Sequence, residues 1–397
     1  MSGELPALHL DPRPALLEDT GLRAVLAALG AGKARVVGGA VRDLLVERAV
    51  TDIDIATVMP PGEVLAALAR AGIKAVPTGI AHGTVTAVLH GRPFEITTLR
   101  HDVETDGRHA VVKWTGDWRA DAARRDFTIN ALSLDADGNV FDYFGGIGDL
   151  REGKVRFVGE AGARIAEDYL RILRFFRFFA RYGTGVPDAA ALAAIAAHVG
   201  GLARLSVERV WSELKRILSA PDPRSAVALM QRTGVLDSVL PEGADPARLA
   251  SLVAAGAPED PVLRLAALLD GDVWALAVRL KFSRDEAVML AMLRAGPVPR
   301  AGDDDAQLRR LLADDAKPVL IGRSWLAGEP ASVRERLAAM SVPVFPVQGK
   351  DVLECGVPAG PRVGTILRQV REKWLQSGCT LPEAKLRAEI TQAAYNT

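Results

Sequence analysis

The sequence predicts an α/β head followed by an all-helical remainder. Up to residue 150 or so, short strand-like runs alternate with helical ones, and after residue 157 the strand signals nearly vanish in favour of alanine- and leucine-rich helical patterns. The chain has 397 residues, which is long enough for roughly two or three domains with a sizeable core. A mixed head with a long helical extension is therefore expected.

The elements of the head follow from local patterns. Residues 34–48, "ARVVGGAVRDLLVER", predict a strand, a Gly-Gly turn and a helix. "TDIDIAT" (51–57) alternates polar and apolar residues with period two, which indicates a half-buried strand. The remaining predictions are a helix at 60–72 that begins near Pro61 and ends at Gly72, two strands within 83–100 joined by a turn at 91–93, and a polar loop at 100–114.

The helical remainder shows apolar residues at helical spacing. Three stretches each predict one amphipathic helix: 205–220, 224–240 and 260–280. Near the end of the chain, Pro361 near the start and Gly378 past the end delimit a further helix.

Charge and cysteine content limit the class of protein. Lys+Arg and Asp+Glu both number 49, so a preference for nucleic acid has to come from a local surface. Residues 151–182 provide such a surface, with eight basic and four acidic side chains. Cys355 and Cys379 are too few for a disulfide framework or a zinc site. With no signal peptide at the N-terminus and no apolar run of about 18 residues, we expect a soluble cytoplasmic protein.

Asp52 and Asp54 are the first candidates for chemistry. Residues two apart on a strand point to the same face, so the two carboxylates would project together while Ile53 and Ile55 pack inward. Neighbouring carboxylates repel each other unless a divalent cation holds them, and Mg²⁺ is bound by one or two carboxylates plus substrate phosphates. Glu95 adds a third carboxylate if its strand lies beside this one. The structural alternative is a set of solvated acids on edge strands.

A Gly-Gly turn lies just upstream of these aspartates. "VVGGAVRD" ends a strand at Gly38 and Gly39 and begins a helix with Arg42 on its first turn. Glycines let backbone N–H groups approach an anion, and the arginine adds positive charge. A lone Gly-Gly pair is usually only a turn, and the sequence lacks the GxxxxGK[ST] and GxGxxG patterns. Together with the paired aspartates, however, the turn predicts metal-assisted chemistry on a nucleoside triphosphate.

Residues 123–132, "ARRDFTINAL", place several polar groups before an apolar end. In a functional interpretation, Arg124 or Arg125 contacts the triphosphate while Asp126 and Asn130 hold the loop or a ribose. A helix start with ordinary surface charge explains the same composition, and both interpretations stay open.

The stretch 167–183, "EDYLRILRFFRFFARYG", combines charge with aromatic residues. Asp168 and Arg171 are three apart and would share a helix face that Arg174 and Arg177 extend. A carboxylate accepts hydrogen bonds and a guanidinium donates them, so the pair matches cytosine and adenine, which present an amino donor beside a ring-nitrogen acceptor. Uracil and guanine present the opposite order. The alternative is an ion-pair ladder within the helix. Four phenylalanines are expected in the core: Phe175, Phe176, Phe178 and Phe179.

Taken in order, these motifs resemble those of the class II CCA-adding enzyme and bacterial poly(A) polymerase family, tRNA nucleotidyltransferases of the polymerase β superfamily. "GGAVRD" with "DIDIAT" resembles the family's motif A, and "RRDFTINAL" its motif B. "FDYFGGIGDLREGKVRFVG" resembles the hinge motif C, "EDYLRILRFFRF" the base-selecting motif D, and "SVERVWSEL" motif E. "GKDVLECGVPAGPRVGTILRQVREKWL" is similar to the tail of bacterial members. Five ordered motifs over most of the chain make the resemblance specific.

The resemblance implies a fold and a set of site residues. It implies a polymerase β-like mixed sheet in a nucleotidyltransferase head (1–155), a helical neck that selects the base (156–225), and a helical body and tail that bind tRNA (226–397). Residues 101–115 correspond to the family's flexible loop, which helps the switch from C to A addition. The implied roles are Mg²⁺ binding by Asp52 and Asp54, triphosphate contact by Gly39, Arg42 and Arg125, and a base pocket of Asp168, Arg171, Arg174 and Arg177.

The implied activity is template-independent addition of C, C and A to tRNA 3′ ends from CTP and ATP. The implied partners are tRNA and these two nucleotides, with no membrane and no obligate protein partner. A poly(A) polymerase and an enzyme restricted to CC or A addition share every motif and remain alternatives. A catalytically inactive RNA-binding relative is disfavoured because both aspartates of "DID" are present.

Overall fold

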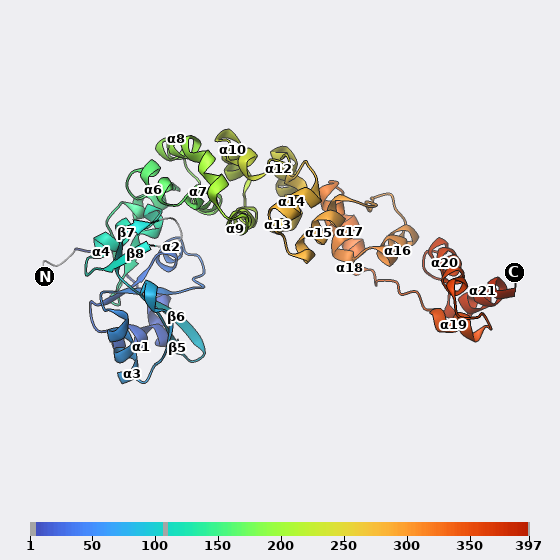
Figure 1. Cartoon of the computed structure of the whole chain (residues 1–397), viewed down its shortest axis with the longest axis horizontal. Coiled ribbons are helices and arrows are strands. Elements are labelled where there is room, and N and C mark those ends of the chain that lie inside the picture. Colours follow the sequence, from blue (N-terminus) through green and yellow to red (C-terminus); the bar gives the residue numbers. More distant parts are fainter. Residues whose placement is uncertain (1–4, 106–109, 396–397) are drawn as a thin grey trace. The chain divides into compact units, whose positions relative to one another are not determined.

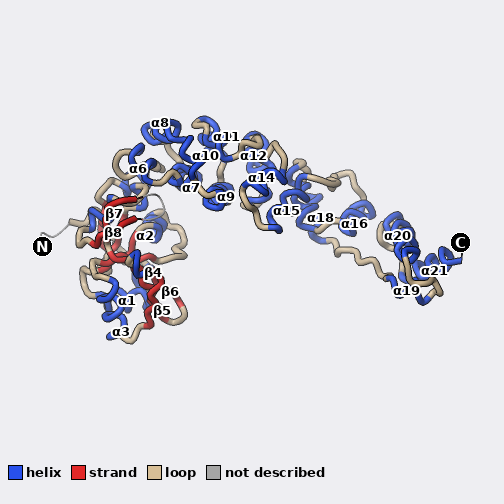
Figure 2. The backbone as a smooth tube through the Cα atoms, viewed as in Figure 1, coloured by secondary structure: helices blue, strands red, loops and turns tan. Residues whose placement is uncertain are grey.

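The computed structural model describes residues 5–105 and 110–395. It divides into two compact units, Met1–Pro241 and Glu242–Thr397. The sheets belong to the first unit and helices make up the second (Figures 1 and 2). The predicted α/β head followed by helices is confirmed.

The head is built on a mixed sheet. Among the described residues it has eight strands in the order β1-β10-β9-β2-β3-β6-β5-β4, in which β3 and β6 are parallel. These strands are β1 (Leu8–His9), β2 (Ala34–Val37), β3 (Asp54–Thr57), β4 (Lys74–Gly79), β5 (Thr84–Leu89), β6 (Arg92–Thr98), β9 (Leu132–Leu134) and β10 (Asn139–Asp142).

One face of this sheet packs on the helices α1 (Thr20–Leu29) and α3 (Pro61–Arg70). Val36, Ile55 and Ile96 are register partners across β2, β3 and β6, and all three are fully buried in this core. Successive side chains on a strand alternate between the faces. The residues next to this apolar row therefore project from the opposite face, where the candidate site lies.

The helix α7 (Leu170–Tyr182) connects the head to the helices that follow it. Its four phenylalanines are buried, which confirms the prediction that they are core residues. The ring of Phe127, from the head, lies edge-on to Phe178 with the centroids 5.2 Å apart. The other α-helices of this unit are α2 (Gly39–Leu45), α4 (Trp118–Ala123), α5 (Gly146–Arg151), α6 (Ala161–Glu167), α8 (Ala189–His198), α9 (Val207–Leu218), α10 (Arg224–Arg232) and α11 (Val235–Val239).

Within the described residues 242–395, the second unit has helices and no strand beyond an isolated bridge between Ala244 and Leu269. Its helices are α12 (Pro246–Ala254), α13 (Pro261–Leu268), α14 (Val273–Arg279), α15 (Arg284–Arg294), α16 (Asp305–Asp314), α17 (Lys317–Leu326), α18 (Ala331–Ala339), α19 (Gly349–Glu354), α20 (Pro361–Gln376) and α21 (Glu383–Tyr395). In the described parts of the chain, no helix is both long enough and apolar enough to cross a membrane.

The prediction of a loop at 100–114 is wrong for most of this stretch. β7 (Arg100–Thr105) pairs with β8 (Ala110–Trp114) in a separate antiparallel sheet, and residues 106–109 lie outside the described part. Both strand segments contain β-branched residues, which favour strands, and the polar composition of the stretch concealed this signal. The resemblance to a flexible loop thus falls on a hairpin.

Two of the predicted helices are each divided in the structure. Residues 224–240 form α10 and α11, separated at Gly234, whose φ of 74° is a left-handed conformation that favours glycine. Residues 260–280 form α13 and α14, and the side chain of Asp272 begins the second by accepting a hydrogen bond from the N–H of Ala275. The turn expected at 91–93 lies one residue earlier, at His90 and Gly91. Periodicity alone did not reveal these breaks.

Candidate active site

Two carboxylates lie side by side on the polar face of the sheet. Asp54 begins β3 and is the register partner of Glu95 on the parallel strand β6. Register partners on neighbouring strands project from the same face, and both side chains are exposed there. The condition set for Glu95, that its strand lies beside Asp54, is met.

Asp52 lies just before β3 and not on it, although the alternation predicted a strand from residue 51. The reason is that β2 ends at Val37, the partner of Asp54, and the chain turns away at Gly38. On the β2 side, Asp52 therefore has no strand residue to pair with. The alternation still holds, because Ile53 is buried while Asp52 and Asp54 are exposed.

The electrostatics of these acids suit a cation. Partial loss of hydration raises the pKa of Asp54, the positive charge of Arg125 opposes the rise, and the charge of Asp52 adds to it. The pKa of Glu95 is also raised, by partial loss of hydration and by the charge of Asp54. Carboxylate oxygens are ligands that Mg²⁺ prefers, so the donor set fits this ion. Among the described residues, no three His, Cys, Asp or Glu side chains lie close enough together to hold a metal ion by themselves.

The Gly38-Gly39 turn brings two guanidinium groups to this site. Gly38 has a φ of 65°, and a Cβ atom there would lie 3.1 Å from Nη1 of Arg125. A Cβ atom on Gly39 would lie 3.5 Å from Nη2 of Arg42. The left-handed conformation of Gly38 favours glycine, and each of the two glycines lies beside its own arginine side chain. Since Arg125 also acts on the charge of Asp54, the turn and the carboxylates form one site.

The side chain of Arg42 is fixed beside the turn. Arg42 is buried, its Nη1 donates to Oδ1 of Asn130 at 2.5 Å, and its Nε donates to Oδ1 of Asp43 at 3.1 Å. Its guanidinium lies 4.4 Å from the ring centroid of Tyr182. The positive charge at Gly39 is thus held in place by the protein before any ligand binds.

Asp126 and Asn130 hold the loop of residues 123–132. Asn130 donates to Oδ1 of Asp126 at 3.0 Å, and Nε of Arg174, on α7, donates to Oδ2 at 2.7 Å. Burial alone would raise the pKa of Asp126, but Arg174, Asn130 and the N–H of Phe127 outweigh it and lower the pKa. The interpretation of these residues as loop-holding groups agrees with this geometry, and the loop contains a short 3₁₀ turn and not the start of an α-helix.

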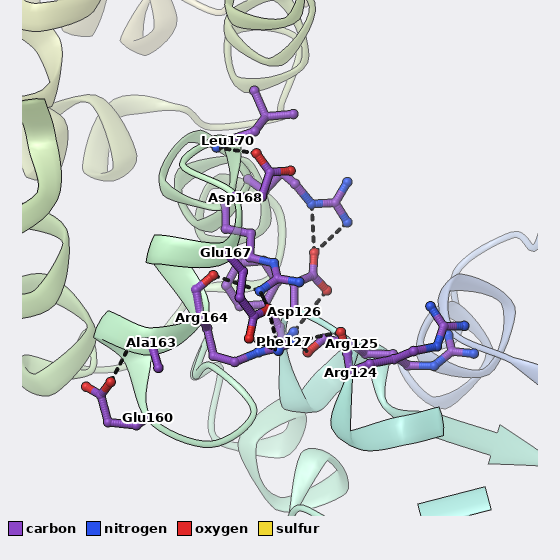
Figure 3. A network of polar contacts seen from close by, with 12 residues as sticks. Arg124, Arg125, Asp126, Phe127, Glu160, Ala163, Arg164, Glu167, Asp168 and Leu170 are labelled. Carbon is purple, nitrogen blue, oxygen red and sulfur yellow. Dashed lines mark hydrogen bonds and ion pairs between the residues drawn. The ribbon is translucent and has the colours of Figure 1, made fainter. Parts of the chain in front are cut away.

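Asp168 and Arg171 lie close together in the chain, but they do not pair with each other. Asp168 is extended and precedes α7, so the prediction that the two share a helix face is wrong. Oδ1 of Asp168 accepts from the N–H of Leu170 at 3.0 Å, and Oδ2 accepts from Nη2 of Arg209 at 2.7 Å. Arg171 donates to Glu167 at 2.5 Å. Each of the two groups is therefore held by its own partners, and the bond from Leu170 to Asp168 can be followed in Figure 3.

The alternative interpretation, an ion-pair ladder within α7, is also wrong for Arg174 and Arg177. Arg174 pairs with Asp126 in the head, and Nη1 of Arg177 donates to Oε1 of Glu213 on α9 at 3.1 Å. Burial and the charge of Arg174 lower the pKa of Arg177 to about 10, although Glu213 opposes the change. These arginines join α7 to other elements.

Comparisons with known proteins identify the family. A family model described as "Poly A polymerase head domain" matches residues 34–156, and one described as "Probable RNA and SrmB- binding site of polymerase A" matches residues 187–245. "CCA tRNA nucleotidyltransferase 1, mitochondrial" from Mus musculus is 40% identical over 373 residues, which cover 90% of this chain and 86% of that protein. The chain belongs to the CCA-adding tRNA nucleotidyltransferase family.

One further relative and one solved structure are also similar to this chain. The "CCA-adding enzyme" of Geobacillus thermodenitrificans is 36% identical over 363 residues, covering 83% of this chain and 86% of that protein. The crystal structure of the Bacillus stearothermophilus CCA-adding enzyme in complex with CTP matches with a TM-score of 0.76 and 28% identity, and covers 96% of this chain and 98% of that one. The family predicted from the motifs, and its polymerase β-like head, are thus confirmed.

Some groups around this candidate site could not be found from the motifs alone. Arg209 and Glu213 lie four residues apart on α9 and pair with Asp168 and Arg177. Their helical spacing was visible in "SVERVWSEL", but their partners are distant in the sequence. Arg164 could not be found for the same reason, since the backbone carbonyls that it contacts lie about 40 residues upstream.

Proposed function

We propose that this chain adds C, C and A to the 3′ ends of tRNA from CTP and ATP, without a template and with release of diphosphate. The observation that carries the proposal is the single site made by Asp54, Glu95 and the two arginines at the Gly38-Gly39 turn. The names of the similar proteins, and the CTP bound in one of their structures, support the same substrates.

In the proposed reaction, the RNA 3′-hydroxyl attacks the α-phosphate in line with the departing diphosphate. Asp52 and Asp54 would hold Mg²⁺, and Glu95 is the third carboxylate of the same face. When bound, the metal supplies Lewis-acid stabilisation of the entering and leaving oxygens. Arg42 and Arg125 bind and orient the triphosphate at the Gly38-Gly39 turn, where their fixed positions reduce the reorganisation that the reaction requires.

Base selection is assigned to the segment that begins α7. Asp168 provides an acceptor and Arg171 a donor, which matches the edges of cytosine and adenine. Arg174 and Arg177 line the same side of the helix. The support for this assignment is that the carboxylate of Asp168 is oriented by Leu170 and Arg209 before a base arrives.

The tRNA is assigned to the helical part of the chain, in line with the RNA-binding family model over 187–245. The division into a head (1–155), a neck (156–225) and a body with tail (226–397) stays a prediction. So does the cytoplasmic location, since one relative carries "mitochondrial" in its name.

The test is nucleotide addition by the purified protein to three tRNA transcripts, which lack CCA, CA or the final A. With Mg²⁺ and single nucleotides, we expect CTP to serve the first two transcripts, ATP to serve the third, and UTP and GTP to serve none. Repeated incorporation of A would identify a poly(A) polymerase. Failure of ATP to serve the third transcript, or activity only on that transcript, would identify a partial enzyme, and no incorporation at all would contradict the proposal.

A further inference from the structure

Arg164, on α6, lies between two parts of the site without belonging to either. Its Nη2 donates to the backbone carbonyls of Arg124 and Arg125, the latter at 2.7 Å. Its Nη1 donates to both carboxylate oxygens of Glu167, at 2.7 and 2.6 Å (Figure 3). A single guanidinium therefore connects the loop that carries the triphosphate arginine with the segment that precedes α7.

Glu167 continues this connection to the base-reading side. The same carboxylate accepts from Arg171 at 2.5 Å, and Arg171 also donates to the backbone carbonyl of Arg164 at 2.7 Å. Two arginines thus share one acid, and the shared acid is the residue before Asp168. The contacts thus form a chain: the backbone carbonyl of Arg125 contacts Arg164, Arg164 contacts Glu167, and Glu167 contacts Arg171.

These contacts require the protein to bury a charged side chain. The side chain of Arg164 is 11% exposed, and its Nε is buried with no hydrogen-bond partner among the described residues. Burial and the charge of Arg171 lower the pKa of Arg164. A planar guanidinium can hold two carbonyls and a carboxylate at a fixed mutual distance, which a lysine ammonium cannot do.

We propose that Arg164 is a positioning residue that sets the distance between the triphosphate arginine Arg125 and the base-reading residue Arg171, and so contributes to the choice of nucleotide. The proposal rests on the proposed function. A base can be read only if its edge and its triphosphate meet their partners together, because the sugar joins them at a limited distance. Small misplacements of reacting groups are known to cost rate steeply.

The test uses Arg164→Lys, which keeps the charge but loses the planar fork, and Glu167→Gln, which keeps the shape but loses the shared charge. Dissociation constants for CTP, ATP and UTP are measured by titration, and kcat and KM by C addition to tRNA. We expect the preference for CTP over UTP to fall on the order of tenfold in both variants. We expect the affinity for inorganic triphosphate to change much less, because it has no base to align.

Arg323 on α17 is the matched control. It donates to the backbone carbonyls of Met292 and Pro297 and to Asp315, so it also joins two carbonyls with one carboxylate, and its side chain is 5% exposed. Arg323→Lys should lower the melting temperature and leave the CTP:UTP preference unchanged.

The outcomes separate the two proposals. An unchanged preference in folded Arg164→Lys and Glu167→Gln, with only a lower melting temperature, would reduce Arg164 to a structural role and overturn the inference. If the unmodified protein adds no nucleotide, the proposed function fails, and the binding constants still decide whether Arg164 affects discrimination. Equal affinity of the unmodified protein for CTP and UTP would overturn the inference as well.

Discussion

The helices α7 and α20 both carry several basic residues, but they hold them differently. On α7, the side chains of Arg171, Arg174 and Arg177 are between 14% and 32% exposed. On α20, those of Arg371 and Lys373 are 38% and 53% exposed. The charges of the first helix are largely withdrawn from water, whereas those of the second remain in it.

Their partners differ in the same way. Asp126 and Glu213, which pair with α7, are 8% and 5% exposed and come from other elements of the unit. Asp314 and Glu389, which pair with α20, are 54% and 31% exposed. Breaking a buried pair leaves an uncompensated charge, whereas an exposed pair contributes little. The difference shows that α7 uses its arginines to fix positions around the site, while the ion pairs of α20 stay at the surface.

The largest expected effect tests whether nucleotide addition takes place in the first unit, the one that contains α7. Asp54→Ala should lower the rate of nucleotide addition by at least about a thousandfold, because it removes a carboxylate that would hold the metal. Binding of tRNA should change little, since Asp54 does not face the RNA body in the proposed reaction. Addition assays with Mg²⁺ and filter binding measure the two effects.

The control for this substitution is Asp137→Ala, which removes an exposed aspartate from a turn in the same head. It should retain normal turnover. Near-normal turnover of Asp54→Ala would instead refute the metal assignment.

A second prediction compares the two helices directly through their acids. Glu213→Gln should lower the free energy of unfolding of the first unit by about 3 kcal/mol, because it leaves the largely buried guanidinium of Arg177 without its acidic partner. Glu389→Gln should cost less than about 1 kcal/mol. Urea denaturation of both variants gives the two values, and equal costs would contradict the contrast between the helices.

The sequence predicted the local elements well and the long-range contacts poorly. The turn at Gly38, the helix that begins at Pro61 and the buried phenylalanines of α7 follow from short patterns, because glycine, proline and apolar spacing act on their own neighbourhood. The adjacency of Asp54 and Glu95 was a condition that the sequence could state but not decide. It depends on strand pairing across about 40 residues.

The segment of residues 168–171 shows why the rest could not be predicted. A spacing of three residues suggested that Asp168 and Arg171 share a helix face, but α7 begins only at Leu170. The extended conformation of Asp168 is held by Arg209 from a distant helix, and local spacing carries no information about such a partner. The hairpin of β7 and β8 was missed for a different reason, since polar residues hid its strand pattern.

A third prediction concerns this segment. Asp168→Ala combined with Arg171→Ala should reduce the preference for CTP and ATP over UTP and GTP by roughly tenfold, because mismatched hydrogen-bonding groups cost about 1–3 kcal/mol each when buried. The four relative incorporation efficiencies measure this preference. Arg42→Ala should slow all four nucleotides alike, since it meets the phosphates only, and an unaltered preference in the double variant would refute base reading by this pair.

The smallest expected effect comes from α20. Unlike the loss of Asp54, it should change the binding of tRNA and leave the use of the nucleotide as it is. Arg368 is exposed on this helix, and if the helical body and tail bind tRNA phosphates, Arg368→Ala should weaken tRNA binding slightly at low salt. It should also reduce the slope of log K against log salt by about one, because one fewer counterion is released. The KM for CTP should stay the same, since the proposed nucleotide site lies in the other unit. Glu372→Ala, which removes a negative charge from the same helix, should instead strengthen tRNA binding a little. If neither substitution changes the affinity or its salt dependence, the exposed charges of α20 do not meet RNA, and the difference between the two helices is one of burial alone.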